Sequence, residues 1–172
     1  MSLQLGAGLG LCGILAHRIG DNSTEVVLTD GDTDALVKLR ENVALNKGDY
    51  GTITCQQLLW GKENAEAFLQ YNHGGILFDV ILASDVIYVP GVVEPLFATV
   101  QTLLCPTAGK FILAYKKRDV PVTNEMVLST AKAAGFLHTC PVPDTPEGIF
   151  LYEFRRNIGA EESQSAPEGC VT

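Results

Sequence analysis

Short apolar segments and amphipathic segments alternate along this chain. Runs rich in β-branched and aliphatic residues predict strands near residues 3–5, 25–30, 51–56, 78–84, 110–115, 136–140 and 149–155. The segments between most of these strands are predicted to be helical. Strands and helices in alternation are typical of an α/β fold with a parallel sheet.

Three of the predicted helices have clear boundaries. Residues 33–47 carry apolar side chains on one helical face and are followed by Gly48, a residue type that commonly ends helices. Residues 92–104 show the same periodicity. The third helix is predicted to span residues 124–134 and to end at Gly135.

The alternation stops near the end of the chain. A turn rich in proline is all that separates the last two strands, which predicts an antiparallel hairpin that closes the sheet. From residue 157 to residue 172 the composition shifts to Gly, Ser, Glu and Pro, which predicts a disordered tail after a single domain of residues 1–156.

The first strand is unusually placed. Residues 3–5 are the only strand residues before a glycine cluster, although the first strand of a doubly wound sheet is central and buried on both faces. We therefore expect a Rossmann-like, doubly wound and mostly parallel sheet that is shortened at its N-terminus, without the elements that normally precede this strand.

Composition narrows the function classes. A length of 172 residues, 47% apolar residues and a net charge of -8 fit one globular domain with a hydrophobic core. The excess of 20 acidic over 12 basic residues repels a phosphate backbone, so no nucleic-acid partner is expected, and the basic residues 116–118 are predicted to be a solvated strand end.

The sequence also lacks the patterns typical of membrane spans, secretory signals and metal sites. No apolar segment reaches the roughly 18 residues that span a membrane, and the first residues lack the basic start of a secretory signal. We expect no membrane association and a cytoplasmic protein, with the nucleus also open. The five cysteines are scattered without a C-x-x-C pair, which favours reduced thiols and no metal site. The oligomeric state stays undetermined.

The glycine cluster in residues 3–13 is the strongest chemical signal. Gly6, Gly8 and Gly10 stand at alternate positions where a strand turns into a helix, which lets the backbone approach a ligand closely. A dinucleotide fingerprint would need its third glycine at position 11, where the chain has Leu11. The pattern G-x-G-x-G suits S-adenosylmethionine better. The alternative is a glycine turn that only lets a helix pack on a strand.

An acidic residue follows the second predicted strand. Asp30 ends this strand about twenty residues after the glycines, where a carboxylate can accept both ribose hydroxyls of a nucleoside. Asp32 is the second candidate for this role. Either residue could instead cap the helix that begins at Thr33.

Two further segments carry candidate residues. Trp60, the only tryptophan, lies just beyond the third strand and could stack on adenine or be a plain core aromatic. Ser84 ends the fourth strand and is counted with the cofactor-binding residues, while Asp85 and Tyr88 follow it. A carboxylate and a phenol at this spacing could hold a cationic amine, or could cap a turn and pack at the surface.

Together these segments resemble the seven-stranded S-adenosylmethionine-dependent methyltransferases, and more narrowly the methyltransferase-like protein-lysine group called family 16. The resemblance rests on residues 5–10, on Thr29-Asp30, on the Leu-x-Trp-Gly loop at 58–61 and on Asp-x-x-Tyr at 85–88. Gln4 stands where this group usually has Glu, which implies weaker cofactor binding.

The resemblance implies an enzyme that moves a methyl group from S-adenosylmethionine to a lysine amine of a protein substrate. Asp85 and Tyr88 are then the catalytic candidates: Asp85 docks the ammonium, and Tyr88 lines the channel and stacks on the amine. Gly6, Gly8, Gly10, Asp30, Trp60 and Ser84 are the cofactor-binding candidates. The alternatives are a methyltransferase for small amines and a noncatalytic module that keeps the cofactor fold.

Overall fold

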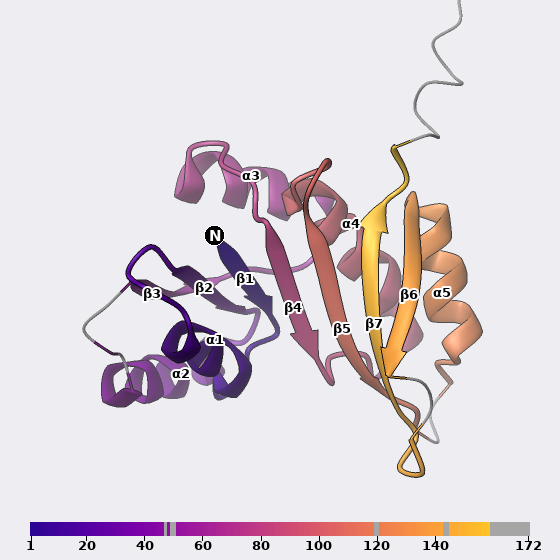
Figure 1. Ribbon diagram of the computed structural model, residues 1–172, viewed down its shortest axis with the longest axis horizontal. Coiled ribbons are helices and arrows are strands. Elements are labelled where there is room, and N and C mark those ends of the chain that lie inside the picture. Colours follow the sequence, from indigo (N-terminus) through magenta and orange to yellow (C-terminus); the bar gives the residue numbers. More distant parts are fainter. Residues whose placement is uncertain (47, 49–50, 119–120, 143–144, 159–172) are drawn as a thin grey trace, which may run out of the picture.

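The computed structural model describes residues 1–46, 48, 51–118, 121–142 and 145–158. Seven strands form one sheet, shown in Figure 1. The strands are β1 (Ser2–Leu5), β2 (Glu25–Asp30), β3 (Thr52–Gln57), β4 (Val80–Ser84), β5 (Lys110–Lys116), β6 (Phe136–Val142) and β7 (Ile149–Arg156). The helices are α1 (Leu11–Ile19), α2 (Thr33–Asn46), α3 (Lys62–His73), the 3-10 turn η1 (Pro90–Val92), α4 (Val93–Leu103) and α5 (Asn124–Ala133).

The strand order is β3-β2-β1-β4-β5-β7-β6. The first five strands pair in parallel, and β7 pairs antiparallel with both β5 and β6. The predicted doubly wound sheet with an antiparallel C-terminal hairpin is therefore confirmed. The order reverses between β1 and β4, which lie side by side, and ligands of such sheets bind at the carboxyl ends of the strands on either side of this reversal.

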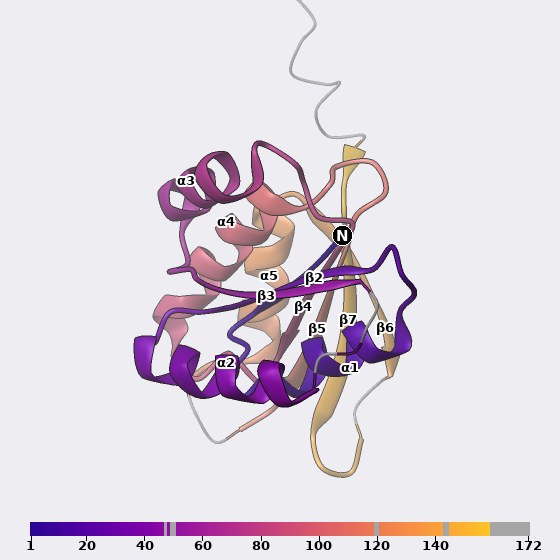
Figure 2. The same cartoon turned by 90° about the vertical axis from the view of Figure 1, so that its left-hand side faces the viewer.

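Helices cover the sheet from two sides. Figure 2 shows α1 and α2 on one side of the strands and α3, α4 and α5 on the other. Side chains of β2 alternate between the two sides, because Val26 and Leu28 pack in a cluster with α2 whereas Val27 belongs to the larger cluster beneath α3 to α5. The sheet is thus buried on both faces at β2, as an apolar run of strand residues predicts.

Most predicted boundaries differ from the observed ones by one or two residues. The fourth strand begins at Val80 rather than at residue 78, because Phe78 makes an isolated parallel bridge to Leu104 instead. The helix predicted over 92–104 is preceded by η1, in which Pro90 takes the first position. Asn157 donates a backbone hydrogen bond to the Gly135 carbonyl at 2.8 Å, while residues 159–172 of the predicted tail lie outside the described residues.

Among the described residues, no helix is both long enough and apolar enough to cross a bilayer.

Candidate active site

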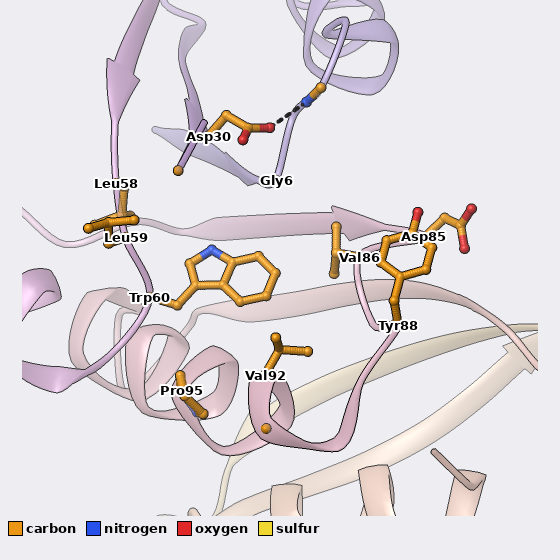
Figure 3. A pocket seen from close by; sticks show the side chains of 13 residues that line it. Gly6, Asp30, Leu58, Leu59, Trp60, Asp85, Val86, Tyr88, Val92 and Pro95 are labelled. Atoms are coloured by element: carbon orange, nitrogen blue, oxygen red, sulfur yellow. Dashed lines mark hydrogen bonds between the residues drawn. The ribbon is translucent and has the colours of Figure 1, made fainter. Parts of the chain in front are cut away.

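A cavity of about 590 Å³ lies at the carboxyl ends of β1, β2 and β4, where the strand order reverses. Figure 3 shows it from close by, with Asp30 at the end of β2, Trp60 of the Trp loop, and Val86 and Tyr88 after β4 arranged around it. The residues that line it are Gly6, Gly8, Asp30, Gly31, Leu58, Leu59, Trp60, Asp85, Val86, Tyr88, Gly91, Val92 and Pro95. The four sequence motifs therefore meet in one place. Gly10 and Ser84 are close in sequence to this lining but are not part of it.

The three glycines of the first loop have different tasks. All have positive φ, at 59° for Gly6, 53° for Gly8 and 88° for Gly10. A Cβ on Gly6 would lie 2.8 Å from a methyl carbon of Val86, and one on Gly10 would lie 2.4 Å from Leu39 Cδ1. A Cβ on Gly8 would meet nothing within 4 Å. Gly6 and Gly10 thus permit close packing, whereas Gly8 leaves open space beside the cavity.

Asp30 and Asp32, the two carboxylates considered for the ribose, have separate partners. Asp30 Oδ2 accepts a hydrogen bond from the Gly8 amide at 2.8 Å, and Oδ1 accepts one from the Asp32 amide at 3.0 Å. Asp32 Oδ1 accepts from the Asp34 amide at 2.8 Å and so caps the start of α2. Asp30 lines the cavity and Asp32 does not. Each Asp30 oxygen retains a second lone pair, so the carboxylate can accept two vicinal hydroxyls.

Trp60 is held as one wall of the cavity. Its ring lies between the Leu58–Leu59 segment and Val86 in Figure 3, and it is half-buried against the larger core. The amide of Gly61, the next residue, donates to Thr99 Oγ1 at 2.8 Å, and Thr99 donates in turn to the Pro95 carbonyl at 2.9 Å. Thr99 is fully buried on α4. The Trp loop is thus fixed from a different layer of the fold, a link that the sequence analysis missed.

Asp85 has an unusual backbone and an unexpected partner. It is the one non-glycine residue with positive φ in the described part of the chain, at 54°. Arg118 Nε donates to Asp85 Oδ1 at 3.3 Å and Arg118 Nη2 donates to Oδ2, so the guanidinium grips both carboxylate oxygens. The carboxylate points away from the Trp60 ring in Figure 3. Residues 116–118 are exposed at the end of β5, which confirms the predicted solvated strand end. The sequence did not predict that Arg118 also pairs with Asp85, which follows from the ends of β4 and β5 lying side by side.

Tyr88 completes this group. The guanidinium carbon of Arg118 lies 5.4 Å from the centroid of the Tyr88 ring, a cation–π distance. Partial burial raises the pKa of the Tyr88 phenol, and the charge of Asp85 raises this pKa further, while the charge of Arg118 lowers it. The net direction is upward, so the phenol is protonated at neutral pH.

Gln4 is turned into the fold rather than toward the cavity. The side chain is buried, and its Oε1 accepts a hydrogen bond from the Gly13 amide at 2.7 Å. A Cβ on Gly13 would lie only 1.9 Å from Leu28 Cδ2, so α1 packs directly on β2 at this point. The Gln4 carboxamide oxygen therefore anchors the first turn of α1 to the sheet.

The residues of the cavity fit an adenosyl cofactor. Asp30 offers two oxygens with free lone pairs, Trp60 offers an aromatic wall, and the missing side chain of Gly8 leaves open space at the cavity lining. Among the described residues, no group of three or more His, Cys, Asp or Glu side chains is placed to hold a metal ion. The fold and the lining of the cavity fit the class of S-adenosylmethionine-dependent methyltransferase domains.

A family model described as lysine methyltransferase matches residues 2–132, and the chain belongs to this family. The protein-lysine N-methyltransferase EFM3 of Chaetomium thermophilum is 28% identical over 149 residues, covering 84% of this chain and 44% of that protein. The protein N-lysine methyltransferase METTL21A of Danio rerio is 36% identical over 103 residues, covering 59% of this chain and 43% of that protein. The chain thus spans less than half the length of these two curated relatives.

Solved structures with low sequence identity share the fold. The CurJ carbon methyltransferase superposes with a TM-score of 0.66 at 18% identity, over 90% of this chain and 48% of that one. A ribosomal protein L11 methylase from Lactobacillus delbrueckii subsp. bulgaricus gives a TM-score of 0.60 at 18% identity, over 90% of this chain and 69% of that one. Family membership and the fit of the cavity together identify S-adenosylmethionine as the cofactor.

Proposed function

We propose that this chain transfers a methyl group from S-adenosylmethionine to the side-chain amine of a lysine in a protein substrate. One observation carries the proposal beyond family membership: Asp85 and Tyr88 line the same cavity as Asp30 and Trp60. A site for an amine and a site for an adenosyl group therefore adjoin within one cavity.

The reaction requires alignment and a neutral amine. The bound cofactor supplies an electrophilic methyl group on a sulfonium. A lysine with a pKa of about 10.4 costs roughly 4–5 kcal/mol to deprotonate at neutral pH. Displacement also requires the nitrogen to lie in line with the bond that breaks, so the protein contributes mainly by positioning the amine and excluding water.

The residues of the site divide these tasks. Asp85 provides a carboxylate that attracts and orients the incoming ammonium, and Tyr88 provides a ring face beside it. Because its pKa is raised, the Tyr88 phenol is neutral and acts as a hydrogen-bonding group rather than as a phenolate base. Asp30 and Trp60, which line the same cavity, hold the ribose and the adenine of the cofactor.

The substrate is expected to present its lysine in a basic segment. The net charge of -8 favours approach of a positively charged partner. One relative, EEF1A lysine methyltransferase 3 of Xenopus tropicalis, is 29% identical over 117 residues, covering 68% of this chain and 47% of that protein. The name of that relative makes EEF1A the first candidate substrate to test.

The test is transfer of a labelled methyl group. Purified chain, S-adenosylmethionine with an isotopically labelled methyl group, and either EEF1A or a cell extract are incubated, and the products are separated into proteins and small molecules. We expect label on a protein, located on lysine by mass spectrometry and strongly reduced by Asp85→Asn. Label confined to small molecules would contradict the proposal in favour of a small-amine methyltransferase. Absence of label with S-adenosylhomocysteine binding intact would contradict it in favour of a noncatalytic module.

A further inference from the structure

The two residues of the proposed amine subsite, Asp85 and Tyr88, already bind a cation of this chain, although this cation is not part of the cavity lining. Arg118 follows β5, and its guanidinium donates to both oxygens of Asp85 while it lies over the Tyr88 ring. The carboxylate and the ring face are the two groups that a lysine ammonium would use. The guanidinium therefore occupies both recognition elements at once.

Arg118 is placed so that it can leave. Its side chain is 35% exposed and that of Asp85 is 43% exposed, so water reaches both partners. Ion pairs with this exposure contribute little to stability, and an exposed cation–π contact adds a similarly small amount. Release of the guanidinium into solvent leaves no buried charge behind. A cationic ligand can then make the ion pair with Asp85 and the cation–π contact with Tyr88 in place of Arg118.

The backbone at Asp85 does not depend on this contact. The Asp85 amide donates to the Ala114 carbonyl on β5 at 2.9 Å, which places the residue at the end of the sheet independently of its side chain. The Asp85 backbone is thus held beside the cavity by a bond that does not involve Arg118. Departure of Arg118 makes the Asp85 oxygens and the Tyr88 ring available to a ligand.

We propose that Arg118 is an internal competitor for the lysine subsite: its guanidinium takes the place of the substrate ammonium on Asp85 and Tyr88, and substrate binds by displacing it. This inference rests on the proposed function in taking Asp85 and Tyr88 as the amine subsite. Its consequence is selectivity. A weakly held amine does not displace the guanidinium, whereas a lysine in a segment with further contacts to the enzyme does.

Binding of a small cation tests this without turnover. The probe is n-butylammonium, which reproduces the end of a lysine side chain, and its binding to the full chain is followed by NMR with and without S-adenosylhomocysteine. The variants are Arg118→Gln, Asp85→Asn and the double variant. The matched control is Arg155→Gln, which removes a guanidinium bonded to Glu153 at 2.8 Å on β7, outside the cavity.

We expect Arg118→Gln to bind the probe about five-fold more tightly than the unmodified chain, or more, as removal of one exposed ion pair and one cation–π contact implies. The gain should vanish in the double variant and should be absent in Arg155→Gln. Unchanged or weaker binding by Arg118→Gln would overturn the inference, because Arg118 would then position Asp85 rather than compete with the ligand. Circular dichroism of each variant verifies folding, and Arg118→Lys provides a second variant that should bind the probe with intermediate affinity.

Failure of the inference and failure of the proposed function are distinguishable. Binding of S-adenosylhomocysteine and transfer of labelled methyl report on the proposed function and do not require Arg118 to move. The order of probe affinities reports on Arg118 alone. If the chain methylates protein but the unmodified chain and Arg118→Gln bind the probe equally well, the proposed function stands and the inference about Arg118 is overturned.

Discussion

Thr99 on α4 accepts a hydrogen bond from the amide of Gly61 at 2.8 Å. Because Gly61 follows Trp60 directly, this bond attaches the tryptophan loop to α4. The same hydroxyl donates to the Pro95 carbonyl, and Pro95 itself lines the cavity. One buried hydroxyl thus connects two parts of the cavity wall that are separated by more than thirty residues along the chain.

Replacement of Thr99 by valine tests this connection. Valine keeps the shape of the side chain but leaves the Gly61 amide without its acceptor, which should lower the free energy of unfolding by about 1–3 kcal/mol. Urea denaturation measures this loss. Thr102→Val is the matched control, because the Thr102 hydroxyl donates within its own helix, to the Ala98 carbonyl at 2.9 Å. Equal losses in the two variants would contradict a specific role for the Thr99–Gly61 bond.

Substitution of Asp30 should lower cofactor affinity, whereas substitution of Asp32 should lower stability. Asp30→Ala removes a carboxylate from the cavity and should weaken S-adenosylhomocysteine binding by roughly ten-fold or more, since hydrogen bonds to a charged group contribute about 1.5–3 kcal/mol. Asp32→Ala removes only the cap of α2 and should cost about 1 kcal/mol of stability with affinity nearly unchanged. Calorimetric titration and thermal unfolding of both variants check this. Unchanged affinity in Asp30→Ala would rule out the ribose assignment.

The phenol of Tyr88 should ionise at higher pH than a free tyrosine. Partial burial raises its pKa above the ordinary value of 10, and the charge of Asp85 adds to this, whereas Arg118 opposes it. As pH rises, the Tyr88 phenol therefore loses its proton at a higher pH than an unperturbed phenol does. The near-ultraviolet difference between the native chain and Tyr88→Phe isolates this titration. Arg118→Gln should move the transition to still higher pH, and a shift to lower pH would contradict the geometry of the three residues.

Gly13 is predicted to tolerate no side chain. In Gly13→Ala the new methyl group would lie within 1.9 Å of Leu28 Cδ2 and 2.7 Å of Gln4 Oε1, and Leu28 is fully buried. Overpacking of this kind costs about 1–3 kcal/mol, more than the gain in helix propensity from alanine. Gly91→Ala is the control, since its Cβ would meet nothing within 4 Å. Chemical denaturation of the two variants should show a loss only at Gly13.

The sequence predicted the sheet well because its signals are local. The apolar face of α2 and the β-branched run of β2 are readable from neighbouring residues, and the alternation of strands and helices restricts the order of a parallel sheet. The start of β4 was misjudged because Phe78 is apolar and buried, yet it pairs with Leu104 outside the strand. Burial and strand pairing are different properties, and hydrophobicity reports only the first.

The site was predictable in outline and not in its contacts. Asp30 and Asp32 stand two positions apart at one turn, and no local rule says which of them meets the Gly8 amide. The Asp85–Arg118 pair depends on β4 and β5 being neighbours, which became visible only with the strand order. The sequence showed the basic cluster at residues 116–118 after a predicted strand, but not that this strand lies beside the one that precedes Asp85.

The hydrogen bond between the Gly8 amide and Asp30 affects the rate at which the cofactor binds. It holds the first loop in its bent shape before any ligand arrives, so little conformational entropy remains to be lost on association. Entry of the nucleoside should therefore proceed by simple collision rather than by a slow rearrangement, with a single kinetic phase in stopped-flow traces. Amide hydrogen exchange at Gly8 should be slow in the free protein and should change little when the ligand is added.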